Sequence, residues 1–178
     1  MDLKKIIVLG SSSLLATNFN FIFSNYKIFY FSRENKNNLN NFKKLNIRNL
    51  EEVKKNFLLI KPDYVFNFVA NTDLQDCEHN DYSYINNIFS NKIAELCLLI
   101  NSKYILISTD QVYYNSFNRE NDKLKLFQKS NYSKDKKLSE DYIKKYLTNY
   151  LIIRTNFFNF SKIKKKNIIG HILSNKII

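Results

Sequence analysis

Short apolar runs alternate along this chain with longer segments in which apolar residues recur at helical spacing. The runs are almost continuously apolar, which is typical of strands that are covered on both faces. The pattern predicts strands at residues 5–9, 27–31, 64–68, 104–107 and 150–153. Helices are expected near residues 14–24, 49–60, 82–100, 131–147 and 167–175.

Regular alternation of strands and helices indicates repeated βαβ units, and therefore a parallel sheet. We predict an α/β fold with a doubly wound parallel sheet in three α/β/α layers. The polar segment 111–130 is expected to be a loop that leaves the carboxyl end of the fourth strand. Because the chain contains no internal repeat and no Gly/Ser linker, residues 1–178 are interpreted as a single domain.

The composition is that of an ordinary globular protein, with 178 residues of which 44% are hydrophobic. No apolar run reaches the roughly 18 residues that a membrane span needs, and the apolar stretch at the N-terminus is too short for a secretory signal. We therefore expect a cytoplasmic protein without a membrane partner. Cys77 and Cys97 lack neighbours at metal-ligand spacing, so both are interpreted as packing residues and no metal site is expected.

A net charge of +12 raises the hypothesis of nucleic-acid binding. Lysine is scattered through every segment, however, which indicates a uniform compositional bias instead of a binding patch. The densest cluster, residues 162–166, is interpreted as a solvated face near the end of the chain. The sequence therefore disfavours nucleic acid as a partner.

Two local patterns carry candidate chemistry. Gly10 follows the first predicted strand and precedes a helix, which is where the pyrophosphate of a dinucleotide rests on backbone N–H groups. Ser13 stands where the usual fingerprint has its second glycine, so this turn alone is weak evidence. Tyr132 and Lys136 have the spacing of a proton-donating pair on one helical face, but lysine is so abundant that such pairs also arise by chance.

Five blocks together resemble the dTDP-4-dehydrorhamnose reductases, which belong to the extended short-chain dehydrogenase/reductases. The blocks are residues 62–78, 85–87, 108–113, 132–140 and 154–157, and they occur in the order and spacing of that family. The resemblance covers essentially the whole chain and implies an NAD(P)-binding Rossmann fold. It also implies reduction of a nucleotide-linked 4-keto sugar by NADPH or NADH, in nucleotide-sugar or surface-polysaccharide biosynthesis.

The resemblance assigns the catalytic roles to Thr109, Tyr132 and Lys136. Tyr132 would donate a proton to the substrate oxygen, and Lys136 would lower the pKa of the phenol and reach the cofactor ribose. Thr109 would orient the substrate oxygen, with Asp110 and Phe157 also at the substrate. Gln111 stands where the related dehydratases have a Glu base, and an amide cannot accept that proton. The related epimerases usually lack the Asp, so a reductase is favoured over both.

For the cofactor, the resemblance implies three contact regions. These are Gly10, Ser13, Leu14 and Leu15 at the pyrophosphate, Asn46 and Ile47 near the adenine, and Ala70, Asn71 and Thr72 at the end of the third predicted strand. Tyr132 and Lys136 would also contact the cofactor. Arg33 closes the second predicted strand, where no acidic residue is present to hold a ribose 2′-hydroxyl, and an arginine can pair with a 2′-phosphate. We therefore expect NADPH to be preferred to NADH.

The C-terminal part departs from the family, whose members continue with another strand and a substrate-binding lobe. That lobe is expected to be largely absent here, so whether the chain catalyses the reduction is left open. A homo-oligomer or a partner chain could supply the lobe, or the chain could be a fragment of a split or decayed gene. The alternative function is a non-catalytic or vestigial Rossmann cofactor-binding module, with a related nucleotide-sugar epimerase as a further alternative.

Overall fold

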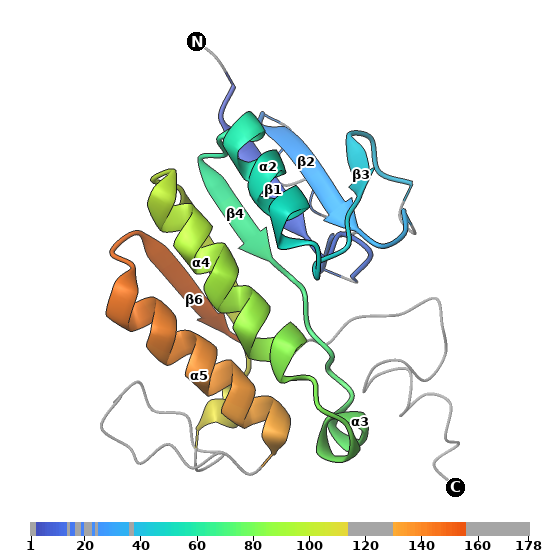
Figure 1. Ribbon diagram of the computed structural model, residues 1–178, viewed down its shortest axis with the longest axis vertical. Helices are drawn as coiled ribbons and strands as arrows, with labels where there is room; N and C mark the ends of the chain where they lie inside the picture. The colour runs from blue at the N-terminus through green and yellow to red at the C-terminus, as the bar shows by residue number, and fades with distance from the viewer. Residues whose placement is uncertain are drawn as a thin grey trace, which may run out of the picture.

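The computed structural model describes residues 3–13, 15–16, 19, 23, 25–35, 38–113 and 130–155. In these residues a parallel sheet of six strands has the order β3-β2-β1-β4-β5-β6 (Figure 1). The strands are β1 (Lys5–Leu9), β2 (Lys27–Ser32), β3 (Phe42–Lys44), β4 (Tyr64–Asn67), β5 (Lys103–Ser108) and β6 (Tyr150–Arg154). The five predicted strands are confirmed with ends that differ by at most one residue. β3 was not predicted.

The helices of the described part are α2 (Leu50–Ile60), α3 (Leu74–His79), α4 (Phe89–Leu99) and α5 (Asn131–Tyr146). The helices predicted near 49–60 and 131–147 correspond to α2 and α5. The segment predicted as one helix at 82–100 consists of a π-helical turn, Tyr84–Ile88, followed directly by α4. Helix α3 was not predicted. The helix expected at 167–175 and most of the one at 14–24 lie outside the described residues, as do positions 114–129 of the expected loop.

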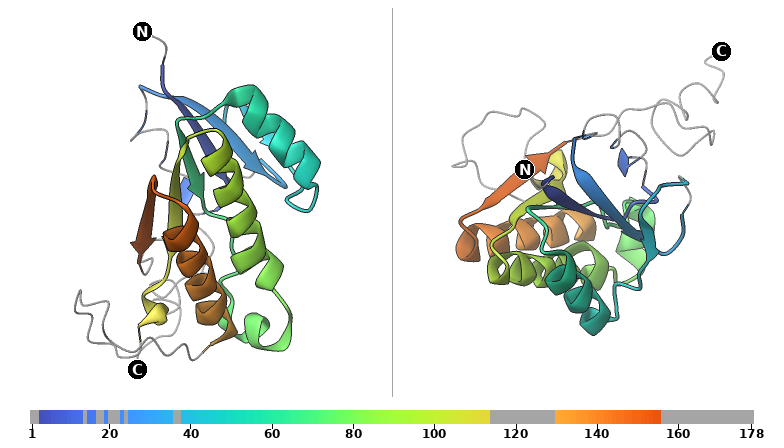
Figure 2. Two further views of the ribbon diagram at one scale, coloured as in Figure 1. Left: turned by 60° about the vertical axis from the view of Figure 1, so that its left-hand side comes forward. Right: turned by 90° about the horizontal axis from the view of Figure 1, so that it is seen from above.

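Helices α2, α4 and α5 cover one face of the sheet (Figure 2). Buried residues recur along α5 at intervals of three or four, so one side of this helix faces the sheet. On the opposite face, the rings of Phe19 and Phe66 lie 4.8 Å apart between centroids, and Phe23 stacks on Phe19. Strand β1 lies at the centre, and the winding runs outward from it in both directions. This is the doubly wound Rossmann arrangement, as the sequence predicted.

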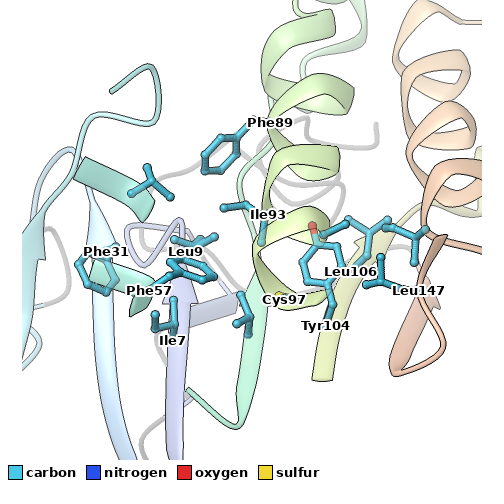
Figure 3. Packing of buried hydrophobic residues seen from close by; sticks show 14 of the residues in the cluster. Ile7, Leu9, Phe31, Phe57, Phe89, Ile93, Cys97, Tyr104, Leu106 and Leu147 are labelled. Carbon is cyan, nitrogen blue, oxygen red and sulfur yellow. The ribbon is translucent and has the colours of Figure 1, made fainter. Parts of the chain in front are cut away.

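The larger hydrophobic core lies between the sheet and its helical layer. Figure 3 shows Phe89, Ile93 and Cys97 projecting from α4 toward the sheet, where they meet side chains of β1 and β5. All three are almost completely buried. The hydroxyl of Tyr104 on β5 accepts a hydrogen bond from the Asn67 side chain at 2.8 Å, so this buried phenol has a polar partner within the core.

Among the residues described, no helix is long and apolar enough to cross a membrane. The same residues contain no cluster of His, Cys, Asp or Glu side chains arranged to hold a metal ion.

Candidate functional site

A cavity of about 550 Å³ opens at the carboxyl ends of β1, β2 and β4. This is the switch point of the winding, where parallel α/β sheets bind their ligands. Its wall is formed by the turn after β1, the end of β2, the segment that follows β3, and the segment that follows β4. The predicted cofactor residues that line it are Gly10, Ser13, Arg33, Asn46, Ile47, Ala70 and Asn71. Leu15 and Thr72 are not among the lining residues, and Leu14 lies outside the described part.

The turn after β1 fits a closely approaching dinucleotide. Gly10 has a φ of 75°, and a Cβ built there would lie 2.9 Å from the backbone of Phe68 and Val69. Only glycine tolerates both conditions. The N–H of Gly10 donates to the Phe31 carbonyl at 2.8 Å, which ties this turn to the end of β2. Ala16, at the third glycine position of the usual fingerprint, is completely buried, as close helix-to-strand packing requires.

The segment that follows β4 is held by hydrogen bonds of Asn71. Its backbone N–H donates to the Asn86 side chain at 2.8 Å, and its amide nitrogen donates to the Asp76 carboxylate at 2.9 Å. Its side-chain oxygen accepts the N–H of Asp73 at 3.1 Å. The Asn71 side chain therefore positions the loop. Hydrogen bonds from Tyr82 and then Asn71 lower the pKa of Asp76.

Thr109, Tyr132 and Lys136 lie at the carboxyl end of β5. Thr109 directly follows the strand, and its hydroxyl oxygen accepts the N–H of Gln111 at 3.2 Å. Helix α5 begins with a capping box in which the Ser133 N–H donates to Ser130 Oγ, so Tyr132 occupies the first turn of the helix. All three candidate catalytic residues are buried, and α5 packs against the turn Asp110–Val112. The structure thus brings them to one region, but none of them lines the 550 Å³ cavity.

Burial dominates the protonation behaviour of the tyrosine and the lysine. It raises the pKa of Tyr132 to about 12, with smaller contributions from Cys77 and Asp110. It lowers the pKa of Lys136 to about 8, against the opposing effects of Glu140 and Asp135. The expected lowering of the Tyr132 pKa by Lys136 is not found in this structure, because burial of the phenol and the neighbouring Cys77 and Asp110 all raise this pKa.

Two charged residues that the sequence analysis did not single out support this region. The Glu140 carboxylate accepts hydrogen bonds from Ser108 Oγ at 2.6 Å and from Arg154 Nη2 at 2.6 Å. The Arg154 guanidinium lies 4.7 Å from the centroid of the Tyr113 ring. The hydrogen bonds of Glu140 to Ser108 and Arg154 connect α5, β5 and β6 beside the candidate catalytic residues. Both residues fall within the blocks that carry the family resemblance, but their pairing becomes visible only in the fold.

Asp110 and Gln111 form the short turn after Thr109. The Gln111 side chain accepts a hydrogen bond from Ser130 Oγ at 3.5 Å, which joins this turn to the start of α5. Phe157, which the resemblance assigns to the substrate, lies outside the described residues.

Solved structures of similar fold include several nucleotide-sugar enzymes. The dTDP-4-dehydrorhamnose reductase of Bacillus anthracis, in complex with NADP, has a TM-score of 0.72 at 21% identity, over 89% of this chain and 57% of that one. The Clostridium acetobutylicum dTDP-4-dehydrorhamnose reductase has a TM-score of 0.75 at 22% identity, over 96% and 58%. The UDP-glucose 4-epimerase of Thermotoga maritima, with UDP-glucose, has a TM-score of 0.73 at 20% identity, over 84% and 54%. This chain therefore spans a little more than half the length of these enzymes.

A comparison with curated protein sequences finds no match. The family model described as the RmlD substrate binding domain matches residues 4–176, which is nearly the whole chain. Together with the reductase neighbours, this match confirms the resemblance that the five sequence blocks indicated. The chain belongs to the RmlD substrate binding domain family.

Proposed function

We propose that this protein reduces the carbonyl group of a nucleotide-linked 4-keto sugar with a nicotinamide cofactor. The observation that carries the proposal is the placement of Tyr132, Lys136 and Thr109 together at the carboxyl end of β5, the same edge of the sheet at which the cavity opens. The reaction would take place in the cytoplasm. It belongs to nucleotide-sugar biosynthesis and would supply precursors for surface polysaccharides.

We assign one role to each of the three residues. Hydride transfer is the chemistry that the nicotinamide supplies when it is bound. The Tyr132 phenol, with a pKa raised to about 12 by burial, stays protonated near neutrality and donates its proton to the carbonyl oxygen. Thr109 orients that oxygen through its hydroxyl group. Lys136, on the same face of α5 one turn further, holds the cofactor ribose.

NADPH is the proposed cofactor, with NADH as the weaker ligand. Arg33 lines the cavity directly after β2, where ribose 2′ substituents lie in Rossmann folds. No Asp or Glu is among the described residues that line the cavity, so a carboxylate that would hold a free 2′-hydroxyl is missing from that wall. In a measurement of both dissociation constants, NADPH is expected to bind more tightly, and equal affinities would remove Arg33 from this role.

The activity is tested by following NADPH oxidation in the presence of a dTDP-linked 4-keto sugar. The wild-type protein should oxidise NADPH only when the ketone is present, and Tyr132→Phe should abolish that oxidation while leaving NADPH binding in place. Tyr146→Phe is the matched control, because Tyr146 lies on the same helix with an exposed side chain and should be replaceable without effect. Equal turnover in wild type and Tyr132→Phe would contradict the proposed proton donor.

A cofactor-binding module without turnover is the second candidate. It is favoured by the position of Thr109, Tyr132 and Lys136 outside the lining of the cavity. This candidate predicts NADPH binding by the wild-type protein together with no ketone-dependent oxidation. The same assay therefore separates the two functions.

A further inference from the structure

The cavity has a second arginine that neither the sequence blocks nor the proposed NADPH contact uses. Arg33 follows β2, and Arg48 lies in the segment between β3 and α2, and both line the cavity. Strand β3 pairs in parallel with β2, and the Leu45 N–H donates to the Ser32 carbonyl at 2.9 Å. The two strands therefore end side by side, and their following segments carry the two arginines into the same wall.

Arg48 is fixed in place by three interactions. Its guanidinium carbon lies 4.7 Å from the centroid of the Tyr84 ring. The Tyr84 hydroxyl donates to the Ile47 carbonyl at 2.9 Å, which fastens the adjoining backbone to the same tyrosine. The backbone N–H of Arg48 donates to the Asn46 side chain at 3.0 Å. An arginine held in this way loses less conformational entropy when it binds a ligand than a mobile one does.

Stacking on a ring leaves the binding capacity of the guanidinium intact. The ring covers one face of the planar group, whereas its five N–H donors point outward in the plane. Arg48 is exposed to solvent, and the described lining contains no Asp or Glu to which it could be paired within the cavity. Two positive charges in one wall without a facing carboxylate favour a ligand group that carries a double negative charge.

We propose that this cavity contains a phosphate site near Arg33, and that Arg48, stacked on the Tyr84 ring, is the second cation of that site. The ligand is an adenosine whose ribose bears a 2′-phosphate. The inference rests on the proposed function, because the Rossmann arrangement brings the adenosine ribose to the end of β2. It goes beyond the single contact of Arg33 in making recognition of the 2′-phosphate a task shared by two loops. Arg48 is thereby a specificity-determining residue.

The test compares two small ligands that differ only in the 2′-phosphate, namely adenosine 2′,5′-bisphosphate and AMP, by isothermal titration calorimetry. In Arg48→Gln, affinity for the bisphosphate should fall by about ten-fold or more, as the loss of a charged hydrogen bond implies, whereas AMP affinity should change less than about two-fold. Tyr84→Leu should show a smaller loss of the same selective kind. Lys54→Gln, an exposed position of α2 outside the cavity, removes the same charge and should leave both affinities unchanged.

Equal losses for both ligands in Arg48→Gln would overturn the inference, because Arg48 would then support the base or the fold instead of the 2′-phosphate. No change for either ligand would overturn it as well, and would leave Arg48 as a packing partner of Tyr84. These failures differ from failure of the proposed function, in which the wild-type protein shows no ketone-dependent oxidation of NADPH. Thermal unfolding of each variant shows whether it has folded before its affinities are compared.

Discussion

The Glu140 carboxylate on α5 and the Arg154 guanidinium at the end of β6 form a buried bidentate salt bridge. The distance from Nε to Oε1 is 3.0 Å and that from Nη2 to Oε2 is 2.6 Å. The Glu140 side chain is completely buried, and that of Arg154 is 12% exposed. Buried charges are retained only when they are paired and hydrogen-bonded, and here Ser108 supplies a further donor. The pair therefore fixes the helix that carries Tyr132 and Lys136 to the two strands beside it.

Removal of the Glu140 charge is predicted to destabilise the protein strongly. Glu140→Gln leaves the Arg154 guanidinium without its counter-ion, and loss of one partner of a buried pair costs about 3 kcal/mol or more. This cost is measured by urea unfolding of the wild type, of Glu140→Gln, of Arg154→Met, and of the double variant that carries both substitutions. The double variant should lose less stability than the sum of the two single variants, and additive losses would show that the two side chains do not interact.

Stability is predicted to rise with pH above about 8 because of Lys136. The pKa of Lys136 is lowered by burial from 10.5 in the unfolded chain to about 8 in the folded protein. Between these two pH values the unfolded chain binds more protons than the folded protein does. The free energy of unfolding therefore rises with pH, by up to about 1.4 kcal/mol per pH unit. Below about pH 8 both states are protonated and the gain is lost.

The measurement is the difference in unfolding free energy between wild type and Lys136→Met, which removes the contributions of the other titrating groups. That difference should change in favour of the wild type between about pH 8 and 9.5 and stay level between about pH 6 and 7.5. A difference that is independent of pH across the whole interval would mean that the Lys136 ammonium is not desolvated.

Tyr104→Phe is predicted to destabilise the protein by about 1–3 kcal/mol, although the change removes a single oxygen atom. The Tyr104 hydroxyl is buried, accepts from Asn67 Nδ2 at 2.8 Å and lies 2.9 Å from Ser90 Oγ, so both partners would be left in a dry interior. Chemical denaturation measures the loss. Tyr150→Phe, at an end of β6 that is only partly buried, is the matched control and should be nearly neutral.

Gly10→Ala is predicted to prevent dinucleotide binding. Alanine is strained at a φ of 75°, by about 1–2 kcal/mol, and its Cβ would lie 2.9 Å from backbone atoms of Phe68 and Val69, which cannot yield as a side chain can. The turn after β1 must then move away from β4. Calorimetric titration with NADPH should show no binding, whereas Asn25→Ala, at an exposed position before β2 and outside the lining of the cavity, should bind as the wild type does. Retained affinity in Gly10→Ala would argue against this turn as the pyrophosphate site.

The strands that were predicted from the sequence are those with short, continuous apolar runs such as Lys5–Leu9, because a strand inside a covered parallel sheet needs apolar side chains on both faces. Strand β3 was missed since it has three residues, of which Lys43 and Lys44 are polar and exposed, and its extended form comes from pairing with β2. Helix α3 was missed because its six residues are too few to display a period. Its start is fixed locally by Asp73, whose side chain accepts the Asp76 N–H.

The candidate site divides in the same way. Gly10, Tyr132 and Lys136 were singled out because each belongs to a local pattern of fixed spacing, and their roles stay predictions. Arg48 could not, because it reaches the cavity only through the pairing of the unpredicted strand β3 with β2. The raised pKa of Tyr132 could not be predicted either, since it depends on how deeply the first turn of α5 is buried.

The π-helical turn Tyr84–Ile88 sets how the residues before α4 are rotated about the helix axis relative to the residues of α4 that pack in the core. The Phe89 N–H bonds to the Tyr84 carbonyl, five residues back, so this turn contains one residue more than an α-helical turn would. Successive residues of an α-helix are separated by about 100°. A deletion of one residue here would leave α4 seated on the sheet and rotate everything before it, which would carry Tyr84 away from Arg48 and Asn86 away from Asn71. Length variation in this segment is therefore expected to alter ligand recognition while the hydrophobic core is preserved.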